Sequence, residues 1–194
     1  MRRSEAKAEK RKKQAMGIFI VLIMTMSVLG YMFGKDTAEQ ISYNDFKFNR
    51  IGNRWGTKID QSEYIFDFFP SQVENINVSE DIINRLTNSM QIDMTSDIDS
   101  EYKEAIALSV FELSNYLALN NQYARVGFTQ LNEYEKPMIT CIDATASVPV
   151  IMFEKSNETK VYTQGNCIIA KSKSESDFIA IKDRLLFGLI GIMG

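Results

Sequence analysis

One uncharged segment near the amino terminus limits what the rest of the chain can be. Residues 15–34, AMGIFIVLIMTMSVLGYMFG, contain no Asp, Glu, Lys or Arg. A helix of this length spans about 30 Å, which matches the hydrocarbon thickness of a bilayer. The segment therefore predicts a single transmembrane helix.

The residues before this segment predict its orientation. Residues 1–14 contain seven Lys or Arg residues and two Glu residues. Short basic flanks stay on the cytoplasmic side of a membrane, and they also attract anionic lipid headgroups. We therefore expect a single-pass cell-membrane protein with a cytoplasmic tail at 1–14, a spacer at 35–42 and an extracytoplasmic domain at 43–194.

Two other interpretations of this segment were weighed. A cleaved signal peptide has an apolar core of roughly 7–15 residues that ends at small residues spaced as A-x-A. Here the apolar run is longer, and residues 28–30, Val-Leu-Gly, form a poor cleavage site. A pilin-type leader would carry a small residue directly after the base, which residues 13–15, Lys-Gln-Ala, lack. We favour an uncleaved signal-anchor.

A G-x-x-x-G motif lies at the outer end of the predicted helix. Gly30 and Gly34 are spaced so that two such helices can approach closely. This spacing fits a homodimer formed through the anchor. It also fits a helix that simply ends at its glycines, so both interpretations stay open.

Charge is divided at the anchor. Of the 22 basic and 25 acidic residues, 7 and 2 precede it, so 15 and 23 follow it and the exterior has a net charge of −8. Binding of nucleic acid depends on neutralising phosphates, so this acidic exterior argues against it. The bilayer and a protein in the membrane or envelope are the partners we expect.

The absence of histidine excludes several chemistries. No His occurs in the chain. Ser-His-Asp and Cys-His nucleophiles, and zinc or iron sites built on imidazole, are therefore excluded. The commonest general base near neutral pH is missing as well. We expect no enzyme of these kinds and no cofactor.

Cys141 and Cys167 are the two cysteines, and both follow the anchor. Two cysteines in one small exterior domain usually form a disulfide. We predict this pair and expect it to contribute about 3 kcal/mol. A buried reduced pair is the alternative.

The remaining pattern predicts an α+β domain with an antiparallel or mixed sheet packed on two or three helices. Residues 43–69 alternate aromatic and polar side chains between turn signals, which is typical of an antiparallel meander. We assign the aromatic side chains to the inner face of a sheet rather than to a ligand platform. Further strands are expected at 91–95, 125–131, 138–143, 148–153, 160–163 and 167–171, and helices at 79–90, 100–120 and 174–187.

The helix at 100–120 has an unusually wide apolar stripe. It is formed by Ile106, Val110, Leu113 and Leu117, widened by Ala105, Ala107, Phe111 and Ala118. A stripe of this width predicts a helix that is buried on more than one side.

Carboxylates gather before that helix. Asp93, Asp97 and Asp99 alternate with other residues and resemble a set of oxygen ligands for calcium. No glycine is present for the sharp turn that an EF-hand loop needs. The alternative is that these residues cap the following helix and form its acidic first turn, which the helix dipole favours. Asp143 and Thr145, at a strand end, are explained as turn residues.

Two further features lie in the exterior. Asn77 and Asn157 begin N-x-S/T sequons in predicted loops, which agrees with an extracytoplasmic location. The carboxyl-terminal residues 185–194, LLFGLIGIMG, are uncharged and too short to span a bilayer. They either fold into the core or contact a membrane or partner, and the contact residues would then be Leu189, Ile190, Ile192 and Met193.

These features predict a non-enzymatic, membrane-anchored domain that binds a partner as an accessory subunit of a membrane or envelope complex. One alternative is a membrane-tethered glycan hydrolase that uses only carboxylates, because such enzymes need two acids facing one another. Its candidate residues are Asp93, Asp97, Asp99 and Asp143. A small-ligand or calcium sensor is the other alternative.

Overall fold

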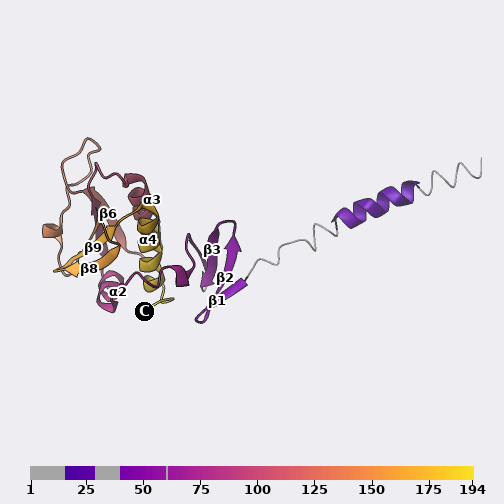
Figure 1. Ribbon diagram of the computed structural model, residues 1–194, viewed down its shortest axis with the longest axis horizontal. Coiled ribbons are helices and arrows are strands. Elements are labelled where there is room, and N and C mark those ends of the chain that lie inside the picture. Colours follow the sequence, from indigo (N-terminus) through magenta and orange to yellow (C-terminus); the bar gives the residue numbers. More distant parts are fainter. Residues whose placement is uncertain (1–15, 29–39, 60) are drawn as a thin grey trace, which may run out of the picture. The chain divides into compact units, whose positions relative to one another are not determined.

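The computed structural model describes residues 16–28, 40–59 and 61–194 (Figure 1). The chain separates into two compact units, Met1–Glu39 and Gln40–Gly194. In the first unit, residues 16–28 form a helix with exposed side chains. The rest of the predicted anchor, including Gly30 and Gly34, lies outside the described residues. Within the described parts of the chain, no helix combines the length and apolarity that crossing a membrane requires.

The second unit begins with the predicted antiparallel meander. Its strands are β1 (Gln40–Tyr43), β2 (Phe46–Ile51), β3 (Arg54–Ile59) and β4 (Ser62–Phe66), paired in sequence order. Aromatic side chains on one face, among them Phe48, Trp55 and Phe66, are buried in the core. The alternation therefore marks the inner face of a sheet, as predicted. β1 starts at Gln40, so the predicted spacer at 35–42 ends earlier than expected.

A second sheet has five strands in the order β6-β5-β7-β9-β8. β5 (Gln91–Ser96), β6 (Tyr123–Phe128), β7 (Val150–Lys155) and β9 (Cys167–Ser172) run parallel, and β8 (Lys160–Gln164) is antiparallel to β9. The helices are α2 (Glu80–Thr87), α3 (Lys103–Leu119) and α4 (Glu175–Leu189), with short 3-10 turns at η1 (Pro70–Gln72) and η2 (Cys141–Asp143). The predicted α+β class is confirmed.

The two faces of the second sheet are covered differently. On one face, Ile92, Met94 and Phe153 join the main core with α3, α4 and the meander. On the other face, Val150 and Ile169 pack under residues 129–149, which connect β6 to β7. The connection from β5 to β6 and the connection from β6 to β7 cross the sheet in opposite directions. Right-handed connections that do so lie on opposite faces of the sheet. The layers are visible in Figure 1, where α3 and α4 lie between the two sheets.

α4 is buried along most of its length, because residues 178 and 180–188 are all buried. Phe187 contacts the meander, with its ring centroid 4.3 Å from that of Phe66. The helix nevertheless carries three consecutive charged residues at its centre, Lys182, Asp183 and Arg184. A buried charge is tolerated only where it is paired and hydrogen-bonded.

Lys182 and Asp183 are paired within α4 and with residues of the meander and α3, whereas Arg184 donates to the backbone carbonyls of Ile76 and Gly194. The Lys182 ammonium lies 2.8 Å from Asp67 and 2.6 Å from Asp183, and it also contacts Glu112 of α3. Arg54 of β3 binds the same Asp67 and Glu112 carboxylates from the meander, at 3.0 and 2.8 Å. We call these five residues the Lys182 network. It joins the meander, α3 and α4.

Burial and neighbouring charges shift the pKa values of Asp183 and Lys182 in opposite directions. Burial raises the pKa of Asp183 to about 6, although Lys182 and the Phe68 backbone N–H both lower it. For Lys182, burial lowers the pKa, but Asp183, Asp67 and Glu112 outweigh that effect and the pKa lies above its ordinary value. The ammonium therefore stays charged at neutral pH.

The carboxyl-terminal tail packs into the core. Gly191 has a φ of 81° and ends α4, after which the Ile192 N–H donates to the Phe187 carbonyl at 2.8 Å. Ile192 and Met193 are 1 and 8 % exposed, and Leu189 and Ile190 are partly buried against the same core. The structure thus favours the core interpretation of this tail over the contact interpretation.

Three local predictions were wrong. The structure places 3-10 helix η2 within the expected strand at 138–143. α3 begins at Lys103 rather than near 100, because residues 97–103 form hydrogen-bonded turns first. Of the four residues predicted to widen the stripe of α3, Ala105 is buried, but Phe111 is 62 % exposed and Ala107 and Ala118 are exposed as well.

Replacing Lys182 with methionine tests the network. Lys182→Met leaves the carboxylates of Asp183, Asp67 and Glu112 without their shared cation, so we expect a loss of about 3–5 kcal/mol in the free energy of unfolding. Urea titration followed by the fluorescence of Trp55, the only tryptophan, measures it. The exposed Lys173→Met is the control and should change stability by no more than about 0.5 kcal/mol. Equal stability of the two variants would contradict the role given to Lys182.

The raised pKa of Asp183 predicts a pH dependence. Between its unfolded value and about 6, the folded state binds a proton that the unfolded state does not. The contribution of Asp183 to stability is therefore lost as the pH rises through about 6. We expect the stability of the wild type relative to Asp183→Asn to fall between about pH 4 and about pH 6 and to level off above that. Parallel pH profiles of the two proteins would contradict this assignment.

Candidate functional site

A cleft that could hold a ligand lies beside α3, at the carboxyl ends of β5 and β6. It has a volume of about 370 Å³. Apolar side chains of α3, β5 and β6 form most of its walls, and the charged side chains at its margin are Asp97, Lys103 and Glu104. In open α/β sheets, ligands bind outside the carboxyl ends of the strands, where the chain connections diverge. Here the connections after β5 and β6 leave on opposite faces of the sheet.

The turn after β5 forms one margin of the cleft. The Asp97 carboxylate accepts the Asp99 backbone N–H at 2.9 Å, and the Gln130 side-chain amide donates to Asp97 and Asp99 at 3.3 and 3.1 Å. Both carboxylates are exposed. The two predicted ligands are thus near one another, but they are held by a side-chain amide from the connection after β6.

A tight turn carries Tyr134 to the cleft. The Asn132 side-chain oxygen accepts the backbone N–H groups of Tyr134 and Lys136, both at 3.1 Å. The Asn132 amide donates to the Lys136 carbonyl at 2.9 Å. The Tyr134 ring lies 6.2 Å from that of Phe128 and is 61 % exposed. The turn therefore presents an aromatic side chain at the cleft without burying it.

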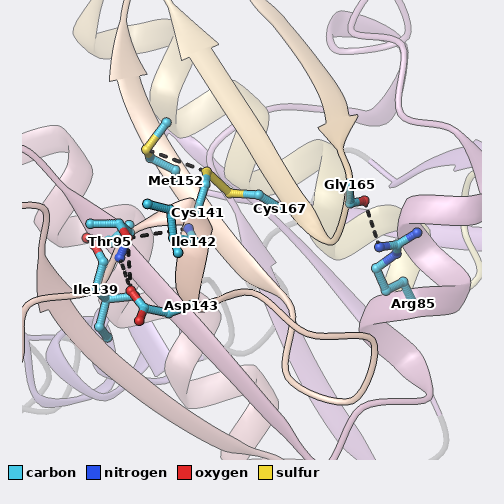
Figure 2. Close-up of a disulfide and its surroundings, with 10 residues drawn as sticks. Arg85, Thr95, Ile139, Cys141, Ile142, Asp143, Met152, Gly165 and Cys167 are labelled. Carbon is cyan, nitrogen blue, oxygen red and sulfur yellow. Dashed lines mark hydrogen bonds between the residues drawn. A yellow bond between two sulfur atoms is a disulfide. The ribbon is translucent and has the colours of Figure 1, made fainter.

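The connection then returns to the edge of β6. The Phe128 N–H donates to Pro137 at 3.0 Å, and the Ile139 N–H donates to Phe128 at 2.8 Å. Gly127 permits this approach, because a Cβ atom there would lie 2.2 Å from the Pro137 oxygen. Farther along, the Thr95 hydroxyl donates to the Ile139 carbonyl at 2.8 Å (Figure 2).

The disulfide holds the end of this connection on the sheet. Cys141 in η2 and Cys167 in β9 are bonded, with Cα atoms 5.2 Å apart, and Figure 2 shows Met152 beside them. The predicted pairing is present, although Cys141 lies in a 3-10 turn rather than a strand. Asp143 completes that turn: the N–H and hydroxyl of Thr140 donate to its carboxylate and lower its pKa.

Asp93 lies away from the cleft, in the interior. It is fully buried, and Arg125 binds both its oxygens through two guanidinium nitrogens, one of them at 3.0 Å. This hydrogen bond raises the pKa of Arg125. Asp93 is therefore a partner of Arg125 and is not brought together with Asp97 and Asp99.

Among the described residues, a different set of three carboxylates lies close enough to hold a metal ion. Oxygens of Asp67, Glu112 and Asp183 are all within 4.8 Å of one another. The Lys182 ammonium already contacts each of them, so the chain supplies its own cation at this position. The cluster is better explained as part of the core than as a metal centre.

Most of the exposed large apolar side chains of this unit lie on three consecutive elements. Of the eleven large hydrophobic residues that are exposed within 40–194, eight lie on α3, on β6 or in the connection that follows: Leu108, Phe111, Leu119, Tyr123, Leu131, Tyr134, Met138 and Ile142. Leu131 and Ile142 are 87 and 94 % exposed. Single exposed apolar residues are ordinary, whereas apolar residues that gather on neighbouring elements are typical of a contact surface.

The two predicted sequons are accessible. Asn77 and Asn157 are exposed, the first before α2 and the second in the turn between β7 and β8. Neither lies in α3, β6 or the 129–149 connection. A glycan at either position is therefore attached outside the elements that carry the exposed apolar residues.

The sequence pattern did not predict this region as a site. A strand was predicted at 125–131, and the structure has it at Tyr123–Phe128, but the sequence does not say that this strand is at the edge of a sheet. Phe111 was assigned to a buried stripe because helical spacing does not distinguish a covered face from an open one. Comparison of the chain with protein-family models, with curated proteins and with solved structures found no match.

Removing the disulfide should destabilise the domain and loosen the connection that flanks the cleft. For Cys141→Ser with Cys167→Ser we expect a loss of about 3 kcal/mol, because the closed loop spans 26 residues. Thermal unfolding with and without dithiothreitol measures it. The reductant should lower the melting temperature of the wild type and leave that of the double variant unchanged. An unchanged wild type would contradict a stabilising disulfide.

Proposed function

We propose that this protein is a single-pass, membrane-anchored extracytoplasmic domain that binds a partner protein as a non-enzymatic subunit of a membrane or envelope complex. We place the binding surface on α3, β6 and the 129–149 connection. The observation that carries this proposal is the concentration there of eight of eleven exposed large hydrophobic residues. In water these side chains favour burial, and at about 25 cal/mol per Å² a partner that covers them gains affinity.

The anchor part of the proposal is based on the sequence. Residues 15–34 are uncharged and follow a basic tail. The net charge of −8 beyond them, the cysteine pair and the two sequons agree with an exterior location. An anchor confines the domain to the membrane surface, where it meets its partners at a raised effective concentration.

The arrangement of carboxylates supports binding over hydrolysis. A carboxylate hydrolase needs two acids facing one another across a cleft. Asp93 is paired with Arg125, Asp143 caps η2, and Asp97 and Asp99 share the amide of Gln130. None of the four is arranged as a free pair across the cleft beside α3.

The cleft itself supports a second candidate function, the binding of a small apolar ligand. Its volume of about 370 Å³ falls within the usual range for ligand pockets, and its walls are largely apolar. A ligand of this kind would contact Phe128 and Tyr134. Stabilisation of the purified protein by a small apolar compound, lost in Tyr134→Ala, would favour this candidate.

Polar substitutions on the proposed surface test partner binding. We expect Phe111→Ser with Leu131→Ser to leave the fold intact, because both side chains are largely exposed, and to reduce chemical cross-linking to the partner in intact membranes at least tenfold. The control is Ile65→Ser, which changes a 41 % exposed residue of the meander. Equal cross-linking by the two variants would contradict the proposed surface.

A further inference from the structure

Ser96 places a hydroxyl group on the wall of the cleft beside α3. It is the last residue of β5 and is 8 % exposed. In the parallel register it pairs with Phe128 of β6 and Phe153 of β7. Directly paired residues direct their side chains to the same face of a sheet, and Phe153 packs in the main core with α3. The Ser96 side chain therefore lies on the face that carries α3, where it lines the cleft.

The hydroxyl of Ser96 is not used by the fold. Among the hydrogen bonds of the described residues, the Ser96 carbonyl accepts the Thr129 N–H at 3.0 Å, but none involves its hydroxyl. The adjacent Thr95 hydroxyl, in contrast, donates to the Ile139 carbonyl at 2.8 Å on the opposite face of the sheet. Buried polar side chains usually have a hydrogen-bond partner. The Ser96 hydroxyl is thus a group on the cleft wall that a ligand can satisfy.

The wall around Ser96 is apolar. The side chains that β5, β6 and α3 contribute to it include Met94, Val126, Phe128, Ile106 and Val110. An ionic group placed against such a wall loses its hydration without gaining a counter-charge, which is costly. A neutral hydroxyl or carbonyl group that forms a hydrogen bond with Ser96 avoids most of that cost. The wall therefore favours a ligand whose polar group is neutral.

The charged side chains at the margin of the cleft do not favour an ionic ligand either. Asp97 and Glu104 are acidic, Lys103 is basic, and all three are exposed. A carboxylate bound at Lys103 would also lie near Glu104, the next residue of α3. An ammonium group bound by the two acids would in turn lie near Lys103. Exposed charges of opposite sign offset one another and are screened by salt, so they select neither kind of ion.

We propose, building on the second candidate function above, that the cleft binds a small neutral molecule with an apolar body and one hydroxyl or carbonyl group. The polar group forms a hydrogen bond with the Ser96 hydroxyl, and the body packs against Met94, Val110 and Phe128. The cleft volume of about 370 Å³ lies toward the lower end of the range for ligand pockets, which suits a molecule of the size of an aromatic alcohol.

Two probes that differ by one hydroxyl group test this assignment. Naphthalene and 2-naphthol are measured by equilibrium dialysis against the full-length wild type, Ser96→Ala and Ser89→Ala, with the same detergent in both compartments. The quantity compared is the Kd of naphthalene divided by the Kd of 2-naphthol. Partition of the probes into detergent is the same for every variant and cancels in this comparison. Ser89→Ala is the matched control, because it deletes a similarly buried hydroxyl that bonds to Arg85.

We expect this ratio to be at least fivefold larger in the wild type and in Ser89→Ala than in Ser96→Ala. One neutral hydrogen bond contributes about that factor, and naphthalene would leave the Ser96 hydroxyl buried without a partner. Equal ratios in the three proteins would overturn the proposal. Naphthalene itself should bind Ser96→Ala at least as tightly as the wild type, because the variant keeps the apolar wall.

Charged probes of the same ring size test the neutral polar group in the wild type alone. We expect 2-naphthoate and 2-naphthylmethylammonium to bind at least tenfold more weakly than 2-naphthol, because the wall offers neither of them a counter-charge. A charged probe that binds as tightly as 2-naphthol overturns the proposal. This result does not depend on the folding of Ser96→Ala.

Two further outcomes separate this inference from the proposed functions. If neither naphthalene nor 2-naphthol binds the wild type, the second candidate function fails and the inference fails with it. If both bind but the ratios are equal, the inference alone fails. Equal ratios together with a tenfold loss of cross-linking to the partner in Ser96→Ala would assign the hydroxyl to the partner protein instead of a small ligand.

Discussion

The Lys182 ammonium, held among Asp67, Glu112 and Asp183, joins the meander to the helices α3 and α4. The two sheets share no strand, and α3 and α4 lie between them. Apolar packing, such as that of Phe187 against Phe66, supplies most of the burial at this junction. Apolar packing is compatible with many relative positions of the meander and the two helices. The buried Lys182 ammonium, in contrast, contacts its three carboxylates in only a few of these positions.

This junction also determines which surface stays accessible. One side of α3 is committed to α4 and, through Glu112, to the meander. The helix therefore cannot rotate to cover Phe111 without breaking its contact with Lys182. On the opposite face of the sheet, the disulfide and the Thr95 hydroxyl hold the 129–149 connection in place. Between these two fixed parts, β6 keeps an open edge beside an apolar cleft.

Much of the fold could be predicted from the sequence. Period-two alternation with aromatic residues located the meander, and helical spacing located α2, α3 and α4, because these signals are local. The cysteine pair followed from the small number of cysteines. The division into two sheets, the parallel order of the second sheet and the burial of Lys182 depend on contacts between residues far apart in the chain. A Lys-Asp-Arg triplet on a helix looks the same in sequence whether it faces solvent or carboxylates.

The sequence by itself determined the uncharged segment at 15–34, the acidic exterior, the absence of histidine and most secondary structure, since each depends on composition or on neighbours a few residues away. Only the tertiary structure decided that Ile192 and Met193 of the tail are buried in the core, that Asp93 is paired with Arg125, and that β6 is an edge strand. The physical reason is that burial and backbone pairing are satisfied by whichever elements the chain topology brings together, and that topology is not encoded in any short stretch of residues.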